Sequence, residues 1–258
     1  ITFLDVNALL ISDLTGIQDF TDLTVLYCQD NMLTSLDISN NTYLTKLYCQ
    51  GMLLTSLDIS NNLNLLNLVC SYNQLTTLDV SYNTALTELS CSGNQLTSLD
   101  VSNNTALTYL LCSNNQLTTL DMSSNLSLTY LSCLHNQLTS IDVSLNTALN
   151  SLSCGYNNLT NLNVDNNTYL TVFRCRHNQL SSLNLTQNTL LNMFECDYNS
   201  LTSLDARNGN NINFLFFKAT NNPNLNCIDV DDFTWATTNW TIANYSIDST
   251  MFFSANCN

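Results

Sequence analysis

Leucine positions recur along this chain in a pattern that repeats every 21 residues. Residues 86–106 show one unit, which reads LxxLxCxxNxLxxLDVxxNxx. Repetition at this period is typical of a solenoid, in which each unit buries its apolar face only against the units above and below it. Nine cysteines mark the period at intervals of 21 residues: Cys28, Cys49, Cys70, Cys91, Cys112, Cys133, Cys154, Cys175 and Cys196.

Each unit divides into halves of 10 and 11 residues, and each half carries one triplet that alternates between inward and outward side chains. Alternation with a period of two predicts a short strand, and neither half has room for a helix of ordinary length. We therefore predict nine to ten coils with two strands each, forming two parallel sheets back to back. Adjacent coils would lie about 4.8 Å apart. With strands on both sides, the solenoid should be nearly straight.

Two asparagine columns accompany the leucines, and we expect both to turn inward and pair with backbone groups, because one amide offers two donors and two lone pairs. Met52 interrupts the first column, so the turn of that coil should be looser. The first column contains Asn31, Asn73, Asn94, Asn115, Asn136, Asn157, Asn178 and Asn199. The second contains Asn41, Asn62, Asn83, Asn104, Asn125, Asn146, Asn167 and Asn188, and ends at Gly209.

The cysteine column favours buried, reduced thiols, because its positions point inward and cysteine is readily buried. Zinc would need clustered ligands with spacings such as CxxC, which are absent. A column of aspartates points outward from the second triplet, flanked by Ser and Thr. We interpret it as a solubilising face, with weak calcium binding by oxygen ligands as the alternative. Its members are Asp37, Asp58, Asp79, Asp100, Asp121, Asp142 and Asp205, with Asn163 and Asn184 completing it.

Composition narrows the classes of function. The net charge is −15 and only 10% of residues are charged, which argues against nucleic acid and against anionic membrane surfaces. No apolar run approaches the 18 or so residues of a membrane span, so we expect no membrane insertion. The two histidines, His135 and His177, belong to no nucleophile, phosphate-loop or metal motif, so we predict neither an enzyme nor a cofactor.

The repeat resembles the leucine-rich-repeat family, and within it the short 21-residue bacterial class called IRREKO. The resemblance covers residues 23–217, and the wording of the units is similar to secreted and surface proteins of the Bacteroidetes. We expect residues 1–22 to form an irregular first coil beneath a truncated amino-terminal cap, because the first residues read like the middle of a repeat. Residues 218–258 break the period and form a carboxy-terminal cap, where Trp235 and Trp240 can cover the last coil.

The family resemblance also has implications for the cap and the compartment. Cys227 and Cys257 do not follow the 21-residue period of the other cysteines. Their placement is similar to that in the terminal segments of related secreted proteins, and this resemblance implies a disulfide between them. A disulfide closing about 30 residues would contribute roughly 3–4 kcal/mol and would require an oxidising compartment. We therefore expect a secreted or cell-surface protein, and a monomer.

The outward positions of the first triplet differ from unit to unit, whereas those of the second are monotonous. We call the former the first-strand face. Exposed aromatic and arginine side chains are typical of binding sites, although an unconstrained face would also vary. In the last unit we place Phe214, Phe216 and Lys218 on this face. The candidate ligand-binding residues are Tyr27, Lys46, Tyr48, Tyr109, Tyr130, Arg174, Arg176 and Glu195.

Two functions remain after these exclusions. The first is a non-catalytic recognition module that binds a protein or glycan through the first-strand face, where Arg174 and Arg176 could clamp an anion. The second is a structural or surface-adsorbing protein, an adhesin or a mineral- or ice-binding protein, that uses the regular Thr/Ser/Asp face. Irregular aromatic residues suit a specific ligand and favour the first.

Overall fold

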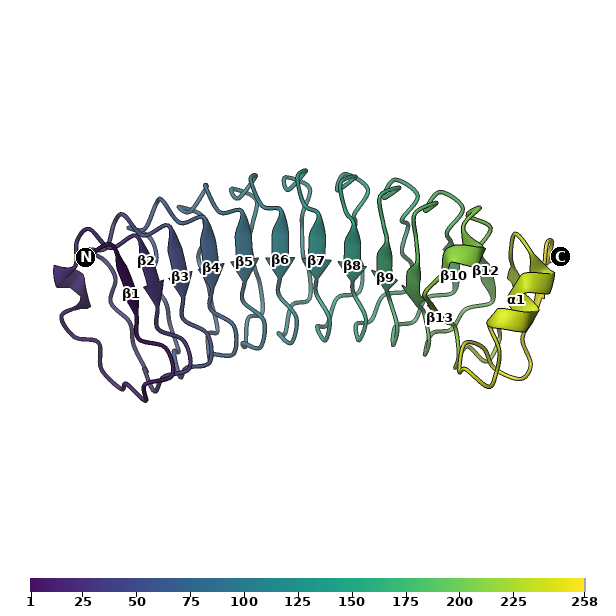
Figure 1. Ribbon diagram of the computed structural model, residues 1–258, viewed down its shortest axis with the longest axis horizontal. Helices are drawn as coiled ribbons and strands as arrows, with labels where there is room; N and C mark the ends of the chain where they lie inside the picture. Colours follow the sequence, from purple (N-terminus) through teal and green to yellow (C-terminus); the bar gives the residue numbers. More distant parts are fainter. Residues whose placement is uncertain (258) are drawn as a thin grey trace. The chain divides into compact units, whose positions relative to one another are not determined.

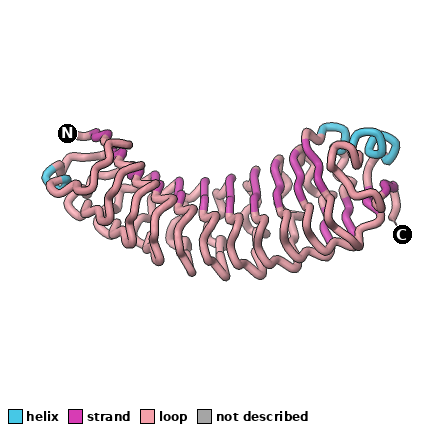
Figure 2. The backbone as a smooth tube through the Cα atoms, turned by 90° about the horizontal axis from the view of Figure 1, so that it is seen from below, coloured by secondary structure: helices cyan, strands magenta, loops and turns pink. Residues whose placement is uncertain are grey.

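The computed structural model describes residues 1–257, which fold as a mostly β parallel solenoid of about 12 turns with very little helix. The chain divides into two compact units, residues 1–128 and residues 129–258. Loops and turns make up most of each coil, and the strands are short (Figure 2). The predicted fold class, a mostly β solenoid with little helix, is therefore confirmed, but about 12 turns exceed the nine to ten coils that were predicted.

The first unit has one parallel sheet, in which each coil contributes one strand of three residues (Figure 1). The pairing is in register, so Val25 lies beside Lys46 and Tyr27 beside Tyr48. One 3-10 turn, η1 at Ile17–Asp19, belongs to the irregular first coil. The strands are β1 (Phe3–Asp5), β2 (Val25–Tyr27), β3 (Lys46–Tyr48), β4 (Asn67–Val69), β5 (Glu88–Ser90) and β6 (Tyr109–Leu111).

The second unit has strands on both sides of its coils. On the first side lie β7 (Tyr130–Ser132), β8 (Ser151–Ser153), β9 (Val172–Arg174), β11 (Met193–Glu195) and β13 (Phe216–Lys218). On the second side lie β10 (Ser182–Asn184), β12 (Ser203–Asp205), β14 (Cys227–Asp229) and β15 (Phe252–Ser254). A 3-10 turn, η2 (Asn211–Asn213), and the helix α1 (Phe233–Asn239) complete it.

Two parallel sheets are thus present, but the prediction of a second strand in every coil is wrong. Within residues 1–257 the second sheet has only the four strands of the second unit. In the first unit the second triplet still alternates, with Ile38 buried and Asp37 exposed, without forming a ladder. Asparagine side chains join the coils there instead: Asn62 Nδ2 donates to Ile38 O at 3.1 Å and to Asn41 O at 2.9 Å.

The first asparagine column also bridges neighbouring coils, as predicted. Asn94 Nδ2 donates to Cys91 O at 3.0 Å in its own coil and to Cys70 O at 3.1 Å in the preceding coil. Its Oδ1 accepts from Leu75 N at 3.0 Å. The second column does not end at Gly209, because the buried Asn208 continues it by donating to Asn188 O at 3.0 Å.

The core between these columns consists of leucines and cysteines. Leu26, Leu47, Leu68 and their equivalents are fully buried. The nine cysteines of the repeat are buried free thiols, as predicted. Burial raises the pKa of the Cys91 thiol to about 12. A thiol with this pKa is almost entirely protonated at neutral pH, so the column packs as an apolar core and has little nucleophilic character.

The carboxy-terminal cap closes the core with aromatic rings. Trp240 is 4% exposed and stacks on Phe217 with ring centroids 3.9 Å apart, and Trp235 meets Trp240 edge-on at 5.5 Å. This confirms the expected cover for the last coil. The strand β13 spans the expected boundary between repeats and cap at residue 217, and that boundary stays a prediction.

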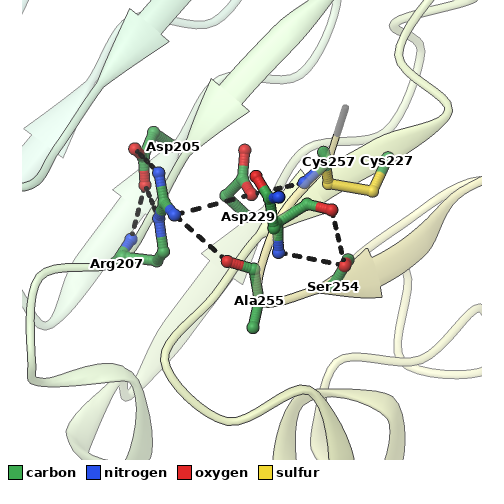
Figure 3. Close-up of a disulfide and its surroundings, with 8 residues drawn as sticks. Asp205, Arg207, Cys227, Asp229, Ser254, Ala255 and Cys257 are labelled. Carbon is green, nitrogen blue, oxygen red and sulfur yellow. Dashed lines mark hydrogen bonds and ion pairs between the residues drawn. A yellow bond between two sulfur atoms is a disulfide. The ribbon is translucent and has the colours of Figure 1, made fainter.

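The disulfide implied by the resemblance is present, between Cys227 of β14 and Cys257 (Figure 3). Beside it, Arg207 bonds to Asp205 and donates to Ala255 O at 3.1 Å, and Cys257 N donates to Asp229 Oδ1 at 2.7 Å. These bonds tie the last strand to the coil before it.

Candidate functional site

The first-strand face is positioned by the triplets of the first sheet. The middle residue of each triplet is buried and its two neighbours point outward, as in β2, where Leu26 is inside and Val25 and Tyr27 are partly exposed. In-register parallel pairing places equivalent outward side chains about 4.8 Å apart. Outward residues 21 positions apart therefore form columns, and their size decides where the face is raised or hollow.

In the first unit, aromatic rings raise the face over β1–β3. The rings of Tyr27 and Tyr48 lie 4.7 Å apart, and Phe3 meets Tyr27 edge-on at 5.6 Å. Partial burial raises the pKa of the Tyr48 hydroxyl, with smaller contributions from the charges of Glu88 and Tyr27. Two of the predicted site residues, Tyr27 and Tyr48, are thus brought together in one rigid aromatic group.

In the next two coils, the residues equivalent to Tyr48 are the smaller Val69 and Ser90, and the first-strand face is recessed there. A recess of about 610 Å³ lies over β4, β5 and β6. Its carboxylate is Glu88, which is half-buried, accepts from Asn67 Nδ2 at 2.6 Å and has no ion-pair partner among residues 1–257. The recess is lined by Asn67, Val69, Thr87, Glu88, Ser90, Thr108, Tyr109 and Leu111.

The chemistry of this recess suits a long side chain with a cationic end. Val69 and Leu111 provide apolar contact for a methylene chain, and the Tyr109 ring can contact a cation through its face. Glu88 can pair with the charge itself. Of these residues Tyr109 was predicted as a site residue, whereas Asn67 and Glu88 were not.

In the second unit, the predicted residues Arg174, Arg176 and Glu195 form one cluster. Arg174 Nε lies 2.9 Å and Arg176 Nε 3.7 Å from the Glu195 carboxylate, and the Arg176 guanidinium lies 5.2 Å from the centre of the Tyr156 ring. The two arginines are therefore partly neutralised, so an anionic ligand would have to compete with Glu195 for them. The other predicted residue of this unit, Tyr130, lies on β7.

Beside this cluster lies a buried carboxylate that the sequence analysis missed. Asp197 is 1% exposed, and its Oδ2 pairs with Lys218 Nζ at 3.1 Å. The burial of His177 lowers the pKa of its imidazole, although the charge of Asp197 opposes the shift. His177 is consequently neutral at pH 7.

In the last coil, Phe216 and Lys218 lie on the first-strand face as predicted, but Phe214 does not. Phe216 rather than Phe214 pairs with Met193, and Lys218 pairs with Glu195. The spacing there is 23 residues instead of 21 because the turn η2 lengthens the coil. Phe214 packs instead against the cap, with its ring 5.3 Å from that of Trp240.

The aspartate column on the opposite face closes turns. Asp100 Oδ1 accepts from Ser102 N at 2.9 Å, and this bond, together with one from the Ser102 hydroxyl, lowers the pKa of Asp100. The neutral Asn163 makes the same bond to Asp165 N at 2.8 Å. The position therefore requires an acceptor oxygen and not a charge. Within residues 1–257 no three His, Cys, Asp or Glu side chains are grouped as metal ligands.

No helix among the described residues has the length and apolar character needed to cross a membrane. No protein-family model matches the chain, and no curated protein matches it. Solved structures do match.

The functional domain of InlJ from Listeria monocytogenes, which includes a cysteine ladder, is 32% identical; the match covers 90% of this chain and 69% of that domain, with a TM-score of 0.56. An internalin, InlF, from the same organism is 24% identical over 100% of this chain and 87% of its own, with a TM-score of 0.64. YopM, a leucine-rich effector protein from Yersinia pestis, is 21% identical over 89% and 73%, with a TM-score of 0.67. The last two likenesses show the fold alone.

Proposed function

The chain belongs to the leucine-rich-repeat family, and we propose that it is a non-catalytic recognition module of a secreted or surface-displayed bacterial protein that binds a protein ligand through the first-strand face. One observation carries the proposal: Glu88, a half-buried carboxylate without an ion-pair partner in residues 1–257, lies in a recess beside an aromatic group. The disulfide between Cys227 and Cys257 supports an oxidising compartment. The similarity to InlJ supports a bacterial source.

The ligand presents a lysine or arginine side chain to the recess. Its methylene groups pack on Val69 and Leu111, and its cation reaches Glu88 beside the Tyr109 ring. A hydrogen bond to a charged group is worth about 1.5–3 kcal/mol, so one basic side chain can dominate the interface. The net charge of −15 draws a basic ligand toward the chain and raises the rate of encounter.

The cluster in the second unit provides complementary contacts. Glu195 holds Arg174 and Arg176 through their Nε atoms, which fixes both guanidinium groups in position. The terminal nitrogens of a guanidinium can then pair with a ligand carboxylate. The two units thus bind different groups of the ligand. The recess binds a lysine or arginine side chain, and Arg174 and Arg176 bind a carboxylate.

The test is a selection of peptides from a random phage-displayed library against the immobilised chain. The wild-type protein should enrich peptides that contain Lys or Arg, and Glu88→Gln should abolish that enrichment because it removes the charge and keeps the shape. Asp58→Asn, which neutralises an exposed carboxylate on the opposite face, is the matched control and should enrich the same peptides. Loss of binding in Asp58→Asn but not in Glu88→Gln would mean that the wrong face has been chosen.

Adsorption through the regular Thr/Ser/Asp face is the second candidate. Its support is the even repetition of the aspartate column, in which each turn holds one carboxylate oxygen in the same position. Hydroxyapatite adsorption and ice-recrystallisation assays test it with the same two variants. Adsorption that is weakened by Asp58→Asn and not by Glu88→Gln would favour this function over recognition.

A further inference from the structure

A ladder of stacked rings runs along one edge of the coils in the second unit. His135, Tyr156, His177 and Tyr198 succeed one another in consecutive coils, with ring centroids 3.9, 4.1 and 4.1 Å apart. The planes deviate from parallel by only 14°, 13° and 11°. Such close, nearly parallel stacking fixes the orientation of every ring in the ladder.

The backbone makes this ladder unusual. All four residues have a left-handed conformation, with φ between 52° and 56°. The equivalent positions of the first unit include Gly51, Gly93 and Asn114, which suit that conformation better than a ring does. Histidine is enriched in this conformation and Tyr72 also adopts it in the first unit, so what distinguishes the second unit is that four rings follow one another in consecutive coils.

The ladder stops at Tyr198, and a pocket begins there. The equivalent residue of the next coil is Asn221, which is also left-handed at φ 59° but has no ring. Among residues 1–257, Tyr198 stacks on His177 alone, and its side chain is 47% exposed. The pocket beyond it measures about 470 Å³ and is lined by Tyr198, Lys218, Thr220, Asn221, Ile242, Tyr245, Ile247, Asp248 and Ser249.

Two charged side chains of opposite sign, Lys218 and Asp248, line this pocket. Lys218 Nζ pairs with Asp197 Oδ2 at 3.1 Å, and Asp248 Oδ2 accepts from Asn221 N at 2.6 Å. A cationic ligand would meet the Lys218 ammonium, and an anionic ligand would meet the Asp248 carboxylate. The pocket therefore favours a neutral ligand.

We propose that this pocket binds a pyranose sugar, whose apolar face stacks on Tyr198 as the next ring of the ladder. Lys218 and Asp248 keep further donors and acceptors besides their present partners, and a purely aromatic ligand would cover these, with the polar groups of Asn221 and Ser249, without pairing them, which is unfavourable. The hydroxyl groups around a sugar ring are donors and acceptors that can pair them, while Ile242 contacts the rest of the ring. The volume lies within the range of ordinary small-molecule sites.

This site is separate from the recess at Glu88, since it belongs to the second unit and uses none of the same residues. A glycan bound here and a protein bound at the recess are independent claims. Failure of one therefore leaves the other standing.

Saturation-transfer NMR of the full chain with methyl glycosides of glucose, galactose, mannose and N-acetylglucosamine tests the proposal. At least one glycoside should receive saturation, strongest at the ring protons of one face. Tyr198→Ala should weaken its binding at least tenfold, whereas Tyr198→Phe should retain it, because the ring face and not the hydroxyl makes the contact. Tyr72→Ala is the matched control: Tyr72 has the same left-handed turn position, with φ 56° and 66% exposure, and does not line the pocket.

A second variant tests the site without removing a ring. Asn221→Tyr should extend the ladder into the pocket and block the sugar while Tyr198 stays in place. The proposal is overturned if no glycoside binds the wild type, if Tyr198→Ala binds as well as wild type, or if Tyr72→Ala weakens binding equally. Binding of p-cresol in the pocket without binding of any glycoside would also overturn it.

Discussion

Replacing Asn94 by alanine tests whether side-chain amides hold the coils together. The amide of Asn94 makes three short hydrogen bonds: it accepts from Leu75 N at 3.0 Å and donates to Cys70 O at 3.1 Å and Cys91 O at 3.0 Å, besides a longer contact to Ser92 O at 3.5 Å. Each contributes about 1 kcal/mol net, and the buried Leu75 N–H left without an acceptor adds about 1–3 kcal/mol. Asn94→Ala should therefore reduce the free energy of unfolding by about 4–6 kcal/mol.

Urea denaturation followed by circular dichroism measures this loss, provided that the transition remains cooperative. Gln95→Ala is the control, because Gln95 is the exposed neighbour of Asn94 and its truncation should change stability by less than about 0.5 kcal/mol. A loss of less than about 1 kcal/mol in Asn94→Ala would refute the reasoning.

The reciprocal change is Met52→Asn, in the one coil that lacks the amide. A buried amide without partners would destabilise by several kcal/mol. The new amide can accept from Leu33 N and donate to Cys28 O and Cys49 O, as the equivalent amides do in other coils. The free energy of these hydrogen bonds then offsets the lost burial of Met52, worth about 1.5–3 kcal/mol. The net change should then be within about 1 kcal/mol.

Three further predictions concern the thiols, the aspartates and the cap. Nine thiols should resist alkylation in the folded chain and all nine should react in denaturant, as counted by intact mass; fewer than eight would contradict buried, reduced cysteines. Asp100→Asn should lower the melting temperature at pH 7 less than Asp100→Ala does, since the asparagine oxygen can still accept from Ser102 N. Because the pKa of Asp100 is lowered in the folded chain, its charge stabilises the fold at pH values above the ordinary carboxyl pKa. This contribution is lost as the pH falls through the folded pKa. Melting curves between pH 3 and pH 7 should therefore show a weaker acid dependence in Asp100→Asn. Replacing Cys227 and Cys257 by serine should cost about 3–4 kcal/mol of stability by the chain-entropy estimate, and an unchanged unfolding midpoint would contradict it.

Most of the fold could be predicted from the repeat, because residues at the same position of every unit occupy the same place in every coil. The burial of the leucines and Cys91 and the outward turn of Tyr27 follow from alternation within one triplet. The missing second strands in the first unit could not be predicted from alternation. Alternation specifies which side is buried, whereas a ladder also requires a backbone geometry between neighbouring coils that the period does not encode.

The candidate site was predictable only in part. The pairing of Arg174 with Glu195 was open to prediction, since the two residues are 21 positions apart and so face each other in adjacent coils. The recess at Glu88 depends on the sizes of equivalent side chains in successive coils: Tyr48 is large, and Ser90, its equivalent two coils later, is small. The shift of the last coil, in which Phe216 rather than Phe214 pairs with Met193, follows from two extra residues in a turn whose conformation the period does not encode.

The recognition claim depends on a direct contact between Glu88 and a basic side chain of a protein ligand. A double-mutant cycle measures this contact by calorimetry, using a selected peptide, Glu88→Gln, and the peptide with its basic residue replaced by glutamine. Residues in contact give coupling energies of about 0.5–3 kcal/mol. We predict a coupling of at least about 1 kcal/mol that shrinks as salt is added. Peptide binding with a coupling within error of zero would contradict the assignment of this recess as the recognition site.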